Sequence, residues 1–83
     1  MDPVRVVVLS RAGCHLCVEA EQVVERVCAE VGVGWRRDDI DDATTPPDVR
    51  RRHSDEVPVT FVDGALHDFW RVDEARLRTA LSR

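Results

Sequence analysis

The chain lacks lysine altogether, so its 12 strong bases are all arginines. Its 16 acidic residues outnumber these arginines and give a net charge of −4. Affinity for nucleic acid comes largely from basic side chains that neutralise phosphates. The only dense basic run is Arg50–Arg52, and such a run is usually a solvated helix face. The composition therefore argues against nucleic acid as a partner.

Long hydrophobic runs are also missing. No apolar stretch approaches the roughly 18–20 residues that cross a bilayer, and Met1–Arg5 lacks a basic segment leading into a long apolar one. We therefore expect no membrane contact and no signal peptide, and we expect the cytoplasm as the compartment. With 83 residues, the chain predicts one monomeric domain, residues 1–83, with a modest core.

Cysteine is scarce and unevenly placed. Cys14 and Cys17 form a CxxC pair, while Cys28 stands alone. A secreted disulfide scaffold would more often have an even number spread through the chain, whereas this pattern in an intracellular chain indicates redox chemistry or metal binding. A closed zinc site needs four ligands, and the remaining candidates form no second recognisable pair: His15, Cys28, His53 and His67. We therefore predict no metal site, and zinc or an inert structural cysteine pair remain the alternatives.

The hydrophobic pattern predicts alternating strands and helices. Val4–Leu9 is typical of a strand buried on both faces. Helical spacing then extends from Leu16 to Val31, and Gly32 marks its end. The later segments are a strand over 33–40, a short helix over 46–53 capped by Thr45, a strand over 57–62, a hairpin turn at 63–64, a strand over 65–69 and a last helix capped by Asp73.

This order, β-α-β-α-β-β-α, predicts an α/β fold. Strands separated by helices favour right-handed parallel crossovers, and the closing hairpin adds an antiparallel edge. We therefore expect a four-stranded mixed sheet flanked by helices.

The CxxC pair lies where the first strand gives way to the first helix. A helix N-terminus presents unpaired N–H groups and about half a positive charge, and cysteine pKa values there fall from about 8.5 to roughly 3.5–7.5. Cys14, at the loop end, is therefore the expected nucleophile, and Cys17, one turn further on, the resolving cysteine. Their three-residue spacing allows a disulfide with little backbone movement. A protonated His15 would favour the thiolate and make the pair more oxidising.

Pro58 is a second unusual residue. Proline cannot donate to a sheet ladder, so its place near the start of a core-like strand needs a reason. A cis Val57–Pro58 bond would supply one. A trans proline at a sheet edge or at the entry of the strand is the alternative.

Together, these features resemble the glutaredoxin-like proteins of the thioredoxin superfamily, in particular short bacterial members with a CxLC motif. Nearly the whole length carries the resemblance: Val4–Leu9, the CxxC, Val57-Pro58-Val59, Asp63-Gly64 and the last helix. It implies a thioredoxin/glutaredoxin fold and a thiol–disulfide oxidoreductase that works through a mixed disulfide. It further implies a cis-proline at Pro58 facing the CxxC, substrate pairing by Val57, and Arg11 near the thiolate and the glutathione carboxylate.

The chain also departs from typical glutaredoxins. His15 and Leu16 replace the proline and aromatic residue between the cysteines, and Phe69–Asp73 replaces a Gly-Gly turn followed by an acidic residue. Asp73 keeps the acidic position beside a bound thiol. We expect no bound cofactor, a protein or small-molecule disulfide as substrate, and glutathione, mycothiol or a thioredoxin-type reductase as electron donor. The alternatives are a non-catalytic thioredoxin-fold binding module and a metal or iron–sulfur carrier.

Overall fold

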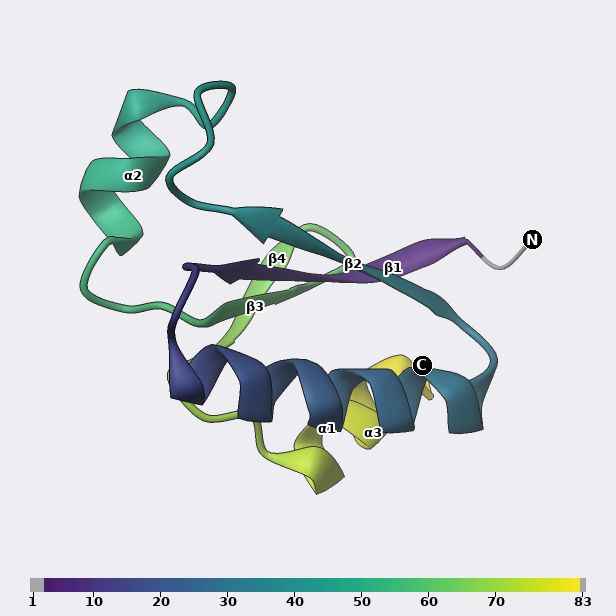
Figure 1. The fold of residues 1–83 in the computed structure, drawn as a ribbon. Helices are drawn as coiled ribbons and strands as arrows, with labels where there is room; N and C mark the ends of the chain where they lie inside the picture. Colours follow the sequence, from purple (N-terminus) through teal and green to yellow (C-terminus); the bar gives the residue numbers. More distant parts are fainter. Residues whose placement is uncertain (1–2, 83) are drawn as a thin grey trace.

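In the computed structural model, which describes residues 3–82, strands and helices follow the predicted order. The elements are β1 (Val4–Ser10), α1 (His15–Val31), β2 (Gly34–Asp39), α2 (Pro47–His53), β3 (Val59–Val62), β4 (Ala65–Phe69) and α3 (Glu74–Leu81). The strands form one four-stranded sheet in the order β2-β1-β3-β4 (Figure 1). The expected α/β class and mixed sheet are confirmed.

The strand directions differ from the general expectation at one connection. β1 and β2 are parallel, as a crossover through α1 requires, but β3 is antiparallel to β1. The reason is that α2 lies at the end of the sheet where β2 finishes (Figure 1). The chain therefore re-enters the sheet from that end, and β3 must run in the opposite direction. β4 then returns antiparallel to β3 as the predicted hairpin.

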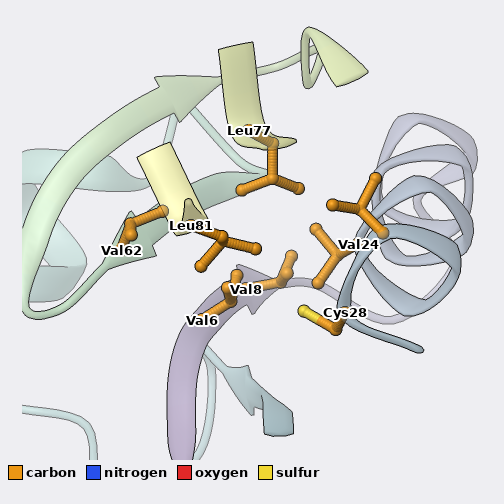
Figure 2. Packing of buried hydrophobic residues seen from close by; sticks show 8 residues of the cluster. Val6, Val8, Val24, Cys28, Val62, Leu77 and Leu81 are labelled. Atoms are coloured by element: carbon orange, nitrogen blue, oxygen red, sulfur yellow. The ribbon is translucent and has the colours of Figure 1, made fainter. Parts of the chain in front are cut away.

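Helices cover the two faces of the sheet unequally. α1 and α3 lie side by side on one face, and α2 lies near the other (Figure 1). Between the sheet, α1 and α3 is the larger core, which Figure 2 shows. Its buried members are Val6, Val8, Val24, Val27, Cys28, Val62, Leu77 and Leu81. A smaller cluster on the α2 side contains Leu9, Ile40 and Val59.

Turn chemistry explains most of the element boundaries. Gly32 ends α1 with a left-handed φ of 82°. Asp63 and Gly64 both have positive φ, at 51° and 83°, as a two-residue type I′ hairpin turn requires. The predicted cap at Thr45 is wrong, because α2 starts after Pro46 without a side-chain cap. The Thr45 hydroxyl donates instead to the Asp39 carbonyl, 2.8 Å away, and so ties this loop to the end of β2.

The predicted strand over 57–62 is shorter in the structure, because β3 begins only at Val59. None of the helices within residues 3–82 has the length and apolar character that a bilayer span requires.

Candidate redox site

Three chain segments meet at the end of the sheet where α1 begins. Antiparallel pairing aligns Val59, the first residue of β3, with the ends of β1 and β4. The positions next along these segments therefore lie side by side: Ser10, Pro58 and Trp70. A hydrogen bond from the Trp70 backbone N–H to the Pro58 carbonyl, 2.7 Å long, fixes part of this arrangement. The CxxC loop starts directly after Ser10, so both cysteines belong to this end of the molecule.

Cys14 occupies the N-cap of α1, as its position in the sequence predicts. Its backbone is extended, with φ −96° and ψ 113°, and its half-buried Sγ accepts a hydrogen bond from the Cys17 backbone N–H at 3.2 Å. Gly13, with φ 76°, provides the preceding turn. A sulfur at this position receives an amide N–H and the positive end of the helix dipole, and both interactions favour an anion.

Cys17 lies in a different environment, although it is only one helical turn away. Its side chain is 1% exposed. Burial raises the pKa of the Cys17 thiol to about 11, and the hydrogen bond with Cys14 acts in the same direction. The backbone of Arg11 and the Ser10 hydroxyl act on the pKa of this thiol in the opposite direction. At neutral pH, Cys17 is therefore a protonated, sheltered thiol beside the more accessible Cys14.

All three cysteines are free thiols in this structure. Cys28 lies away from the pair, in the larger core, where Figure 2 shows its sulfur among valine and leucine side chains. Within residues 3–82, no three His, Cys, Asp or Glu side chains come together as a candidate metal-binding group.

Pro58 forms a cis peptide bond with Val57, one of the two geometries that the sequence left open. Pro58 is buried, and Val57 is half-buried against the smaller hydrophobic cluster. Trp70, which lies next to Pro58, has an unusual positive φ of 64° and stays about half exposed. Its indole N–H donates to the Asp55 carbonyl at 3.1 Å. The proline segment and the turn after β4 are thus joined by two hydrogen bonds from one tryptophan.

Comparison with known proteins agrees with this geometry. The family model described as "Glutaredoxin-like domain (DUF836)" matches residues 5–82. The chain belongs to this glutaredoxin-like family. Its relatives include the proteins named "Uncharacterized protein Rv0508" from Mycobacterium tuberculosis and "Uncharacterized protein Mb0520" from Mycobacterium bovis. Each is 36% identical over 85 aligned positions, which cover all of this chain and 88% of the relative.

A solved structure has the same fold. The X-ray structure of Northeast Structural Genomics target protein XcR50 from X. campestris superposes with a TM-score of 0.70 at 25% sequence identity. The match covers 93% of this chain and 95% of that one. The predicted resemblance to glutaredoxin-like proteins is therefore confirmed at the level of family and fold.

The other predicted substrate-binding residues of this glutaredoxin-like chain lie in distinct settings. His15 is the exposed first residue of α1. The Arg11 guanidinium is held by the Asp41 carboxylate at 2.8 and 3.1 Å and also donates to the Ser54 carbonyl. Asp73 is the N-cap of α3, as predicted, and accepts from the Arg76 backbone N–H. Arg11 thus links the CxxC loop to the segment before Pro58, and Asp73 caps α3.

Three residues of the site were not predicted from the sequence. Ser10 is fully buried and donates to the Glu21 carboxylate at 2.8 Å. Glu21 follows Cys17 by four residues, a spacing that places both side chains on one face of α1 and that could have indicated that Glu21 lies near the pair. Trp70 lines a shallow apolar cleft beside the CxxC with Leu16, Phe69 and Arg71. No local sequence pattern predicts the positive φ of Trp70.

Proposed function

We propose that this protein is a thiol–disulfide oxidoreductase that uses Cys14 as nucleophile and Cys17 as resolving cysteine. The observation that carries the proposal is the asymmetry of the pair. Cys14 caps α1 and accepts a backbone N–H, while Cys17 is buried one turn away. An accessible sulfur at a helix N-terminus next to a sheltered thiol is the arrangement that sequential disulfide exchange requires.

The reaction has two exchange steps. The Cys14 thiolate attacks a substrate disulfide, so one substrate sulfur becomes bonded to Cys14 and the other leaves as a thiolate. Cys17 then attacks the Cys14 sulfur, which releases the second substrate thiolate and leaves a Cys14–Cys17 disulfide. The two substrate sulfurs are reduced and the two cysteines are oxidised. A low-molecular-weight thiol such as glutathione or mycothiol, or a thioredoxin-type reductase, would return the pair to the dithiol.

Reduction of insulin and of a small mixed disulfide tests the proposal, with each donor supplied in turn. We expect wild-type protein to turn over and Cys14→Ser to fall to background. Cys17→Ser should form one stable mixed disulfide and stop there. Cys28→Ala is the matched control, because Cys28 is a buried core residue away from the pair, and it should keep the wild-type rate per folded molecule.

Two results would count against the oxidoreductase. Absence of turnover by the wild type with every donor would favour a non-catalytic binding module. A coloured purified protein that contains iron and loses its colour in Cys14→Ser would favour a cluster carrier.

A further inference from the structure

The turn after β4 carries an apolar surface that the two exchange steps do not use. Phe69 and Trp70 are 41% and 49% exposed, although large apolar side chains are usually buried. Their rings pack edge to face, with centroids 5.0 Å apart and planes at 86°. Adjacent apolar side chains that stay exposed often mark a binding surface. The position of this pair at the redox site makes it a candidate for contact with substrate.

The backbone of Trp70 adopts a costly conformation to place its side chain there. Its φ of 64° lies in the left-handed region, which bulky residues rarely adopt and which is concentrated at functional sites. Two hydrogen bonds hold it in place. The backbone N–H donates to the Pro58 carbonyl at 2.7 Å, and the indole N–H donates to the Asp55 carbonyl at 3.1 Å. Both N–H groups of Trp70 are therefore occupied, and the side chain offers a ligand only its carbon surface.

Trp70 forms one wall of the shallow apolar cleft beside the CxxC. Leu16, which stands between the two cysteines in the sequence, lines the same cleft, whose volume is about 320 Å³. A narrower hollow of about 150 Å³ shares Leu16 and Trp70 and continues along α1 past Ala20 and Val23. Ligand pockets usually measure about 300–1,000 Å³. The cleft therefore has room for one large side chain of a substrate.

The position of the cleft determines what can enter it. A substrate disulfide must bring one sulfur to the Cys14 Sγ, so the groups that flank this sulfur lie over the neighbouring surface. In a polypeptide substrate, these groups are the side chains of the residues next to the cysteine. The charged groups at the rim, Arg71 and Glu19, have opposite signs and face each other at 3.6 Å, so the rim does not favour a charged ligand. An apolar side chain is the group that matches this surface.

We infer that the cleft at Leu16 and Trp70 recognises a large apolar side chain next to the substrate cysteine, so that the substrates are polypeptide disulfides. The inference rests on the proposed oxidoreductase function and names its substrate class. It adds no chemical step, because the Cys14 thiolate attacks the disulfide in the same way. The cleft favours the reaction by burying apolar surface as the substrate sulfur reaches Cys14. Trp70 is thus a specificity-determining residue.

A competition between two peptide disulfides tests the inference. Both are symmetric disulfides of one short peptide, which has phenylalanine on both sides of its cysteine in the first and serine in the second. A limiting amount of reduced protein is mixed with equal amounts of both, and mass spectrometry after acid quenching measures how much of each has become thiol. The same competition with dithiothreitol corrects for intrinsic reactivity. The corrected ratio is the ratio of kcat/KM.

We expect wild type to prefer the phenylalanine peptide by about tenfold, which is the order that burial of one large apolar side chain contributes. Trp70→Ala removes a wall of the cleft and should reduce the preference to about twofold or less. Trp70→Phe keeps an aromatic wall but loses the hydrogen bond to Asp55, and it should keep most of the preference. Leu66→Ala is the matched control, because Leu66 of β4 is 51% exposed but does not line the cleft, and it should keep the wild-type ratio.

Failure of this inference differs from failure of the oxidoreductase. If wild type reduces neither peptide while dithiothreitol reduces both, the dithiol function itself fails and the inference fails with it. If wild type reduces both peptides equally well, only the inference about the cleft is wrong. A Trp70→Ala variant that slows both reactions by the same factor would also overturn it, since Trp70 would then have a structural role alone. Equal loss of the preference in Trp70→Phe and Trp70→Ala would overturn it as well, because the hydrogen bond to Asp55 would then control the selectivity.

Discussion

The two faces of the sheet differ in how they are closed. Hydrophobic packing closes the face toward α1 and α3, where Val8, Val24 and Leu77 are all fully buried. The face toward α2 is only partly covered and leaves an open groove, whose lining includes Val7, Phe61 and the charged side chains of β2. Close packing restricts movement of an element more than scattered surface contacts do. The comparison indicates that α1, which is capped by Cys14 and contains Cys17, is the rigid part of the site.

Polar contacts hold the α2 side instead. Arg50 donates to the Ile40 carbonyl, Thr45 donates to the Asp39 carbonyl, and Arg11 binds Asp41 and Ser54. These bonds join the loops after β1 and β2 to the chain that leads into Pro58. The site therefore combines a helix fixed by packing with a proline segment fixed by hydrogen bonds, and each half can be tested separately.

The largest expected effect is the difference in stability loss between two valine truncations, one on each side of the sheet. Val24 on α1 is 0% exposed, and Val49 on α2 is half-buried. Val24→Ala should lower the free energy of unfolding by about 2 to 3 kcal/mol, because about 0.8 kcal/mol is lost per buried methyl group and a cavity remains. Val49→Ala should cost less than about 1 kcal/mol. Both sites are helical, so propensity changes cancel between them.

Urea unfolding of the reduced proteins measures both effects. Equal losses of stability at the two sites would mean that the α2 face is as well packed as the other. The proposed difference between the two faces would then be wrong.

The contrast between the faces also explains what the sequence could predict. Val4–Leu9 and the periodic residues of α1 belong to the packed face, and their hydrophobic spacing predicted both elements. The Asp63-Gly64 turn was equally clear, because two positive φ values restrict the residue choice. Local patterns of this kind require no knowledge of distant neighbours.

Contacts between distant segments could not be predicted from the sequence. Ser10 lies just beyond the hydrophobic run Val4–Leu9, and Glu21 is a polar residue within the helical pattern of α1, yet their side chains hydrogen-bond across 11 residues of chain. Thr45 has the chemistry of a helix cap, but the end of β2 offers its hydroxyl a carbonyl instead. In each case a tertiary neighbour decides the role of a polar side chain.

Alkaline titration measures how strongly the packed side of the site shields the Cys17 thiol. The pKa of Cys17 lies at about 11 in the folded chain, against about 9 for an ordinary thiol. Folding therefore favours the protonated thiol, and its contribution to stability is complete below about pH 9 and is lost as the pH rises through about 11. At 1.36 kcal/mol per pKa unit, the loss by pH 11 is about 2 kcal/mol.

The composition makes this titration easy to follow. The chain has no tyrosine and no lysine, so thiols dominate its titration in this pH range. The ultraviolet absorbance of thiolate should rise near pH 11 in Cys14→Ser. In the variant that also carries Cys17→Ser this rise should be smaller by one thiolate, and the remaining rise belongs to Cys28, whose pKa burial also raises. A Cys17 that ionises at or below pH 9 would contradict the expected shielding.

The smallest expected effect concerns the ion pair that anchors the proline segment. Asp41 is about half exposed, and the Arg11 guanidinium holds the pKa of its carboxyl below the usual range. An exposed pair of this kind contributes only about 0.2–1 kcal/mol. Asp41→Asn should therefore lower the free energy of unfolding only slightly, and high salt should reduce the difference from wild type. The variant also tests the role predicted for Arg11 in substrate binding, since it releases the guanidinium from its partner. If Arg11 binds a carboxylate of the thiol substrate, Asp41→Asn should lower KM for a glutathione mixed disulfide and Arg11→Ala should raise it. If Arg11 only anchors the loop, both variants should keep the KM of the wild type.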